Sequence, residues 1–302
     1  MKHTTANLLL LLATIIWGTA FVAQTTGMGY IGPFTFSFAR FFLGMLIVLP
    51  FALILEKKNI IKIFFNQKLI ILCFFTGLAL FLGMGLQQYS LLKSQISNAA
   101  FFSTLYVPIV AIISRFLFNS RVTWIIWIAV LLCIYGSYLL SSNQVREVQQ
   151  SDMLVLLAAF FFAIHIILID IFLKNSKALF SFAFLQYTIV FFCSLVVAFA
   201  IENPKLENIK LEWFEIVYTG VFSTGVGYTL QIIGQSKASP APAAIILSME
   251  SVFAVVAGWI ILNQTLDMYK IFGCCLIFFG VLLVQLFPIY LKKKFKTRKS
   301  IV

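Results

Sequence analysis

The chain has 302 residues, of which 62% are hydrophobic and only 11% are charged, and its mean hydropathy is +1.02. A soluble domain carries roughly 25% charged residues, so this composition excludes an ordinary soluble protein. The net charge of +12 could indicate a nucleic-acid partner, and the placement of the charges along the chain has to decide that question.

The apolar residues come in ten runs of about 20 residues, the length that crosses a hydrocarbon core about 30 Å thick. They lie near 6–24, 33–55, 69–90, 96–118, 122–141, 153–173, 179–201, 213–235, 241–262 and 268–290. Most connections are short, which predicts that neighbouring helices run antiparallel. We therefore expect an all-α integral membrane protein with ten transmembrane helices.

The first run could be a secretory signal peptide, because Lys2 and His3 precede it. Cleavage after Ala23 would need a small residue at position 21, where this chain has Phe21. We interpret the run as a retained helix. All five cysteines lie inside apolar runs, are odd in number and show no metal-ligand spacing, so we expect small core residues and no metal or other cofactor.

The stretch from Gly83 to Leu140 recurs, in altered form, 144 positions later, from Gly227 to Val284. Upstream, "FSFAR" at 36–40 matches "FAFLQ" at 182–186 with a shift of 146. The sequence thus predicts two repeats, 1–145 and 146–302, with five spans each. Because five is odd, the second repeat must enter the bilayer from the opposite face, so the two repeats are inverted relative to each other.

The positive charges collect on one side of the predicted spans. With the N-terminus placed in the cytoplasm, 16 Lys and Arg residues fall on the inside and 5 on the outside, which predicts that both termini are cytoplasmic. The basic tail "KKKFKTRKS" is expected to anchor the last helix at anionic headgroups, not to bind nucleic acid. Richness in Phe, Ile and Lys favours a bacterial source, and hence a multi-pass protein of the cytoplasmic (inner) membrane.

Three segments carry a family resemblance: "WGTAFVA" in the first span, "FARFFLG" in the second, and "GVGYTLQIIGQSKASPAPAAIILSMESVFAVVAGWIIL" at 225–262. Together they resemble the EamA-type family of the drug/metabolite transporter superfamily, over nearly the whole chain. The resemblance implies a secondary carrier of small organic metabolites, with amino-acid export as the use suggested by analogy. Members often have proline after the glutamate of the ninth span, where this chain has Ser251; since Pro108 is kept in the first repeat, we expect a kink in one half only.

Three polar residues lie deep in spans, where a charge normally faces a cavity or a partner. Arg40 is in the second run, Glu250 near the middle of the ninth, and His165 near the centre of the sixth. We predict that they bind substrate, or that Glu250 and His165 exchange protons. The alternatives are an Arg40–Glu250 ion pair that only joins two helices, and a histidine that only packs.

Aromatic and amide side chains near mid-depth form a second candidate group. Aromatic faces with a few amides suit organic solutes of modest size. The predicted substrate-binding residues of this kind are Trp17, Phe21, Phe102, Tyr106 and Tyr228, with Gln24, Gln87, Asn98 and Gln231 as polar contacts. With 34 phenylalanines in the chain, simple packing is the competing interpretation.

No G-x-x-x-x-G-K-[ST] phosphate loop occurs, so the energy for transport would come from a proton gradient or from the solute gradient. An integral-membrane enzyme or a sensor without transport activity is the alternative function. An enzyme of this kind needs clustered His, Asp or Glu, and the chain has only two histidines, far apart in sequence. The expected partners are a small organic solute and the lipid bilayer; proton coupling and pairing into homodimers are left open.

Overall fold

A computed structural model describes residues 3–94, 96–117, 123–141 and 150–299, without the side chains of 117, 150 and 288–299. The described part is helical throughout and contains no strand. Nine of its helical stretches are long and apolar enough to cross a membrane, and the 17-residue helix Trp124–Leu140 supplies a shorter tenth. The prediction of an all-α protein with ten spans is confirmed.

The helices follow the predicted runs, with two short ones, α3 and α10, between spans. The first repeat contains α1 (His3–Thr26), α2 (Pro33–Leu55), α3 (Lys57–Phe65), α4 (Gln67–Ser90), α5 (Ile96–Thr104), α6 (Tyr106–Leu117) and α7 (Trp124–Leu140). The second contains α8 (Gln150–Asn175), α9 (Leu179–Ile201), α10 (Leu206–Leu211), α11 (Trp213–Tyr218), the π-helix η1 (Thr219–Tyr228), α12 (Thr229–Gln235), α13 (Pro240–Leu247), α14 (Met249–Leu262) and α15 (Met268–Lys299).

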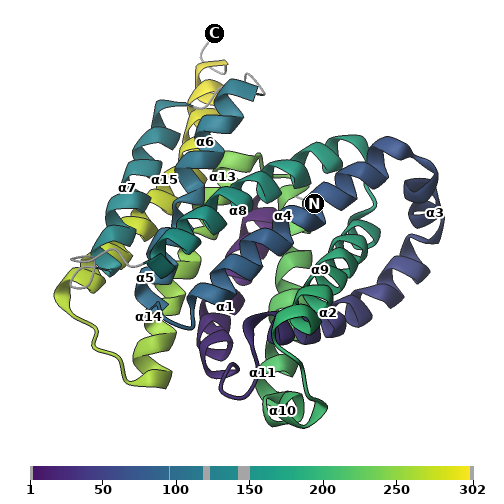
Figure 1. Ribbon diagram of the computed structural model, residues 1–302. Coiled ribbons are helices and arrows are strands. Elements are labelled where there is room, and N and C mark those ends of the chain that lie inside the picture. The colour runs from purple at the N-terminus through teal and green to yellow at the C-terminus, as the bar shows by residue number, and fades with distance from the viewer. Residues whose placement is uncertain (1–2, 95, 118–122, 142–149, 300–302) are drawn as a thin grey trace.

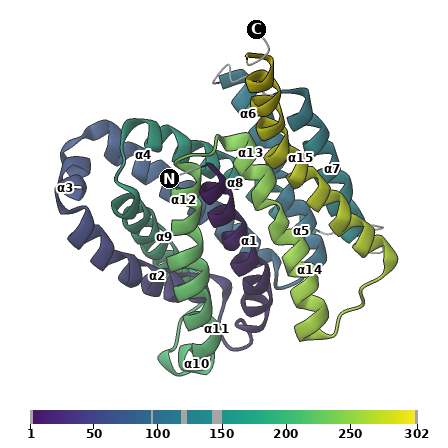
Figure 2. The same ribbon diagram turned by 180° about the vertical axis from the view of Figure 1, so that it is seen from behind.

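The helix packing keeps its pattern when the two repeats are exchanged. The equivalent helices α2 and α9 pack along each other at one end of the bundle, and α7 and α15 do so at the other (Figures 1 and 2). Between these two ends, α1 packs on α14, and its equivalent in the second repeat, α8, packs on α5 and α6. The third span α4 packs on α8, and its equivalent, formed by η1 and α12, packs on α1. Glu202, which follows α9, contacts the first turn of α2, so α2 and α9 are antiparallel and the repeats are inverted.

Both the fourth and the ninth spans are interrupted, at Leu105 between α5 and α6 and at Ser248 between α13 and α14. In the first repeat Pro108 has no N–H to bond the carbonyl of Thr104. In the second repeat the hydroxyl of Ser248 donates to the Ile245 carbonyl at 2.7 Å, and that of Ser251 donates to the Ser248 carbonyl at 2.8 Å. Hydroxyl bonds of this kind bend helices, so the prediction of a kink in one half only is wrong.

The predictions for the cysteines and for the repeat boundary have different outcomes. Cys73 and Cys133 are buried, but Cys193 and Cys274 are only partly covered and Cys275 is exposed on α15, so the core interpretation holds for two of the five. In a membrane span an exposed cysteine faces an apolar solvent and needs no burial. The predicted boundary between 145 and 146, and the side chains of the basic tail, lie outside the described residues.

Candidate functional site

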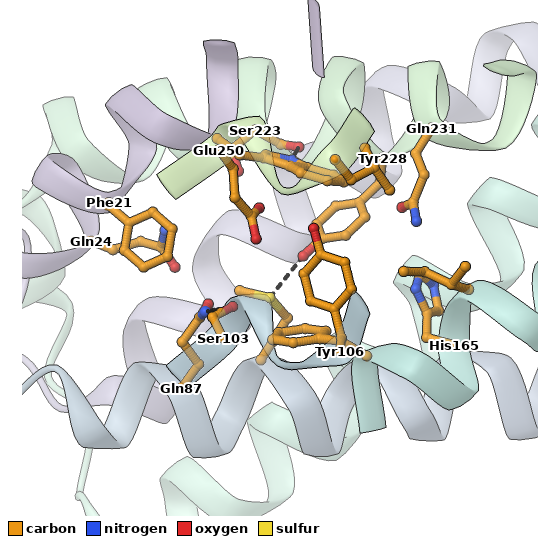
Figure 3. Close-up of a pocket in the computed structure, with 15 residues that line it drawn as sticks. Phe21, Gln24, Gln87, Ser103, Tyr106, His165, Ser223, Tyr228, Gln231 and Glu250 are labelled. Atoms are coloured by element: carbon orange, nitrogen blue, oxygen red, sulfur yellow. Dashed lines mark hydrogen bonds between the residues drawn. The ribbon is translucent and has the colours of Figure 1, made fainter. Parts of the chain in front are cut away.

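A narrow cavity of about 40 Å³ lies among helices of both repeats (Figure 3). It is bounded by the first, third and fourth spans of one repeat and by the sixth, eighth and ninth of the other. Its lining residues are Trp17, Phe21, Gln24, Met84, Gln87, Ser103, Tyr106, Phe162, His165, Ile166, Ser223, Tyr228, Gln231, Leu247 and Glu250. A water needs about 10–15 Å³ of such space, so the cavity in this conformation has room for a few waters.

Most of the lining consists of positions that the repeat makes equivalent. A shift of 144 joins Met84 to Tyr228, Gln87 to Gln231, Ser103 to Leu247 and Tyr106 to Glu250, and a shift of 145 joins Trp17 to Phe162 and Phe21 to Ile166. Three lining residues have equivalents in the other repeat that do not line the cavity, and all three are polar: Gln24, His165 and Ser223. The inverted repeat therefore fixes which positions face the cavity, while individual substitutions set its chemistry.

Glu250 is the one acidic residue among the lining side chains. It lies in the first turn of α14, directly after the break in the ninth span, where the positive end of the helix dipole favours a carboxylate. The hydroxyl of Tyr106, its equivalent in the first repeat, lies beside the carboxylate without reaching hydrogen-bond geometry. Since a charge at this depth costs several kcal/mol unless it meets water or a partner, Glu250 is placed to bind a cation or a proton.

The π-helix brings an aromatic pair to the cavity wall. The Trp17 indole N–H donates to the Ser223 carbonyl of η1 at 3.1 Å, and its ring centroid lies 4.7 Å from that of Tyr228. The Tyr228 hydroxyl in turn donates to the sulfur of Met84 at 2.7 Å. A Cβ on Gly227 would come within 2.6 Å of the Trp17 indole nitrogen, so only glycine allows this approach. π-Helical segments occur often at functional sites, and nothing in the sequence pattern had indicated this one.

The amide and imidazole groups of the cavity are held in different ways. Gln87 donates to the Ser103 hydroxyl at 3.1 Å, and His165 Nε2 lies 2.9 Å from the Gln186 side-chain oxygen. The side-chain oxygen of Gln231 is buried without a hydrogen-bond partner. An unpaired buried oxygen is costly, so Gln231 is ready to accept a hydrogen bond from a ligand or a water.

Arg40 lies behind the cavity wall instead of lining it. Its side chain is fully buried, donates to the Gln24 side-chain oxygen at 3.1 Å, and packs against the rings of Phe36 and Phe41 at 5.7 and 5.2 Å. Its Nε and Nη2 atoms have no hydrogen-bond partner. No ion pair joins Arg40 to Glu250, so the sequence-based alternative of such a pair is not found. Within the described residues, the hydrogen bond of Arg40 to a cavity-lining side chain is the one to Gln24.

Asn98 and Phe102 are also outside the cavity lining. Asn98 accepts a hydrogen bond from the Ser141 hydroxyl at 2.8 Å, which ties α5 to the end of α7. Phe102 packs against Phe101, with 4.8 Å between ring centroids, in an apolar cluster that includes Phe21. Both residues lie on faces of α5 that point toward other helices. The remaining nine predicted residues line the cavity together.

Sequence reasoning missed six lining residues, namely Met84, Ser103, Phe162, Ile166, Ser223 and Leu247. A signal for three of them, Met84, Phe162 and Ile166, was present in the repeat, whereas Ser103 and Leu247 are equivalent to each other and neither had been predicted. Applying the shift to residues already chosen, such as Tyr228 or Trp17, points directly to Met84 and Phe162. Ser223 had no such signal, because its equivalent in the first repeat is Ala79, which does not line the cavity.

Comparison with known proteins agrees with this arrangement. The model of the EamA-like transporter family matches residues 4–142 and 149–286. The chain belongs to this family. A relative from Archaeoglobus fulgidus, described as an uncharacterized transporter, is 30% identical over 286 residues that cover 95% of this chain and 87% of the relative. The uncharacterized transporter YoaV of Bacillus subtilis is 26% identical and covers 89% of this chain and 92% of its own.

A solved crystal structure superposes on this EamA-like chain with a TM-score of 0.78, covering 96% of this chain and 99% of the other. The two sequences are only 17% identical, so this similarity shows the shared fold and nothing about the solute. Together, the family match and the helical architecture make the chain a multi-pass membrane transporter.

Proposed function

We propose that this EamA-like protein is a secondary transporter that moves small organic metabolites, such as amino acids, by alternating access, with export as its net direction. The observation that carries the proposal is the cavity lined by equivalent positions of two inverted repeats. Two halves related in this way can exchange conformations, and the exchange opens the same cavity first to one side of the membrane and then to the other.

The narrowness of the cavity fits a state between the two open ones. A few waters fill about 40 Å³, whereas an amino acid needs a wider space, so the wall must move when a solute binds. The wall contains flexible side chains, among them Met84, Gln87 and Gln231. The interrupted fourth and ninth spans supply the backbone positions at which such a change can begin.

The cavity offers distinct contacts to a zwitterionic solute. Glu250 would meet an ammonium group, and the faces of Trp17 and Tyr228 would cover an apolar or cationic part. Arg40 would pair with a carboxylate once Gln24 turns away from it, which would satisfy the two guanidinium nitrogens that now have no partner. Protonation of Glu250 in exchange for an ammonium group would couple transport to a proton gradient.

The membrane and its orientation are part of the proposal. The excess of Lys and Arg on one side supports cytoplasmic termini, and the composition supports a bacterial inner membrane. A tag on each terminus, exposed to protease in inside-out vesicles, tests the orientation. Cleavage of the two tags on opposite sides of the membrane would contradict it.

The test of function is uptake into liposomes that contain purified protein, measured for each of a panel of amino acids with and without an imposed pH gradient. We expect at least one solute to enter faster than it enters empty liposomes, and the gradient to change its rate. Glu250→Gln should weaken amino-acid binding, measured by thermal shift, because the ammonium group loses its partner, and the uptake that remains should no longer respond to the gradient. The matched control is Glu207→Gln, which changes an exposed carboxylate on α10. A gradient response that survives in Glu250→Gln would exclude this residue as the coupling group.

A further inference from the structure

Two glutamates form reciprocal contacts between the repeats. Glu56 directly follows α2 and Glu202 directly follows α9, and the two positions are 146 apart, the same shift that relates the two helices. The Glu202 carboxylate accepts hydrogen bonds from the backbone N–H groups of Phe34 and Thr35 at 2.9 and 2.7 Å. The Glu56 carboxylate accepts from those of Leu179 and Ser181, both at 2.9 Å. Each helix is thus capped by the residue that ends the other.

Neither helix is capped by a side chain at its own N-cap position. The N-cap positions are Gly32 for α2 and Ala178 for α9, and neither can offer a side-chain oxygen. The first N–H groups of a helix have no partner within it, and the helix dipole makes them attractive to an anion. The caps are therefore supplied by the opposite repeat. Since α2 and α9 are antiparallel spans, the two caps lie at opposite faces of the membrane.

The seam between these two caps is apolar. Phe38 and Phe42 pack against Phe191, and Phe51 packs against Phe180, with ring centroids 5.5–6.5 Å apart. Within the described residues, the side-chain hydrogen bonds between the α2 and α9 segments are those to the two glutamates. Helix association in lipid has little hydrophobic drive, so these two polar contacts hold the ends of the seam together.

The middle of the seam reaches the cavity wall from both helices. In α2, Arg40 bonds Gln24 at 3.1 Å, and the Phe41 ring centroid lies 6.2 Å from that of Tyr228. In α9, the equivalent residues Gln186 and Tyr187 contact His165 at 2.9 Å and Tyr228 at 6.3 Å between centroids. A movement of either helix at one membrane face is therefore passed to residues that line the cavity.

We propose that Glu56 and Glu202 are the two latches of alternating access. Release of one carboxylate lets α2 and α9 separate at that face, while the other cap stays closed and serves as the pivot. Both latches are closed in this structure, in keeping with its narrow cavity. The inference rests on the proposed alternating-access function, and it makes the two glutamates positioning residues, since neither lines the cavity.

The two latches differ in strength. Thr35 donates to Glu202 with its hydroxyl as well as its N–H, both at 2.7 Å, whereas the hydroxyl of the equivalent Ser181 has no partner. Gly32 also allows the Glu202 carboxylate to lie directly on the backbone, where a Cβ would clash with it. The Glu202 latch therefore has three donors and the Glu56 latch two. We expect the resting protein to open more readily at the Glu56 face.

The test uses a single cysteine in place of Ser103, inside the cavity, in a parent with all five native cysteines replaced. A membrane-impermeant maleimide is applied to each face in vesicles of either orientation. We expect the parent to be labelled from both faces. Glu56→Gln should shift the labelling ratio toward the Glu56 face and Glu202→Gln toward the opposite face, each by roughly two- to thirty-fold, the range expected for a lost helix cap. The control Glu207→Gln, which changes an exposed carboxylate on α10, should leave the ratio unchanged.

Thr35→Val is the milder companion variant, since it removes one donor and keeps the carboxylate; it should shift the ratio in the Glu202→Gln direction by less. If Glu56→Gln and Glu202→Gln lower thermal stability but leave the ratio unchanged, or shift it to the same face, the glutamates are structural caps and the latch proposal is overturned. If the parent itself is labelled from one face only, alternating access fails, and the proposed function fails with it.

Discussion

The two repeats share a backbone plan but contribute different chemistry to the cavity. At equivalent positions the first repeat places Met84 and Tyr106 where the second places Tyr228 and Glu250. The third span is α-helical throughout in α4, whereas its equivalent contains the π-helix η1. The two repeats therefore agree in most of the positions that face the cavity, whereas, among the described residues, the lining carboxylate and the π-helix are found in the second repeat only.

Arg40 and Gln186 occupy equivalent positions at which the two repeats differ in charge. Each bonds one cavity residue, Gln24 or His165. Arg40→Gln makes the two repeats alike at this position. We expect the affinity for carboxylate-bearing solutes to fall by about tenfold or more, because a hydrogen bond to a charged group is worth roughly 1.5–3 kcal/mol, while the affinity for amines without a carboxylate stays the same.

Solute-dependent thermal shift, measured over a concentration series of each class, checks this prediction. The matched control is Gln186→Ala, which removes the equivalent polar group without touching a charge. Equal loss of affinity for acids and amines in Arg40→Gln would show that the residue only supports the fold.

The equivalent glycines Gly227 and Gly83 should differ in how much a substitution destabilises the fold. Gly227 lies against Trp17 and the equivalent Gly83 lies against Phe162, where an added Cβ would come within 2.6 and 2.8 Å. Trp17 is fixed by its bond to Ser223, whereas Phe162 has no polar bond and can turn. Gly227→Ala should therefore cost about 1–3 kcal/mol of unfolding free energy, and Gly83→Ala less. The unfolding temperature in detergent is the measurement, and a larger loss in Gly83→Ala would contradict this account.

The smallest effect is expected at Asn98. Asn98→Ala removes the hydrogen bond with Ser141 and should lower the unfolding free energy by about 0.5–1.5 kcal/mol, without changing solute affinity. Gln87→Ala, at a residue that does line the cavity, should change affinity instead. Loss of solute affinity in the Asn98 variant would show that Asn98 does contribute to solute binding.

The sequence predicted the spans and most of the cavity because lipid imposes strong rules. A run of about 20 apolar residues has few alternatives to a spanning helix, and a polar group such as Glu250 or Gln231 inside it must face a cavity or a partner. The odd number of spans in each repeat predicted that the two repeats are inverted relative to each other. Span length and polarity do not determine which face of a helix meets the cavity, which is why Arg40, Asn98 and Phe102, predicted to bind substrate, lie outside the lining.

Other features left no comparable signal in the sequence. The break at Ser248 has hydroxyl-to-carbonyl bonds and no proline, and the three glycines of η1 each lie close against neighbouring helices, which no local pattern announces. Glu56 and Glu202 lie at span ends, where acidic residues are common and need no explanation. That each glutamate caps the opposite helix becomes apparent only from the side-by-side packing of α2 and α9 (Figure 2).

Labelling of Gln87→Cys and Gln231→Cys, one in each repeat, from both faces of the membrane decides whether the two repeats share one cavity. We expect each cysteine to react from either face, and a transported solute to protect both. Reaction of the two cysteines from opposite faces only, or of neither from any face, would contradict a shared cavity that opens alternately to the two sides.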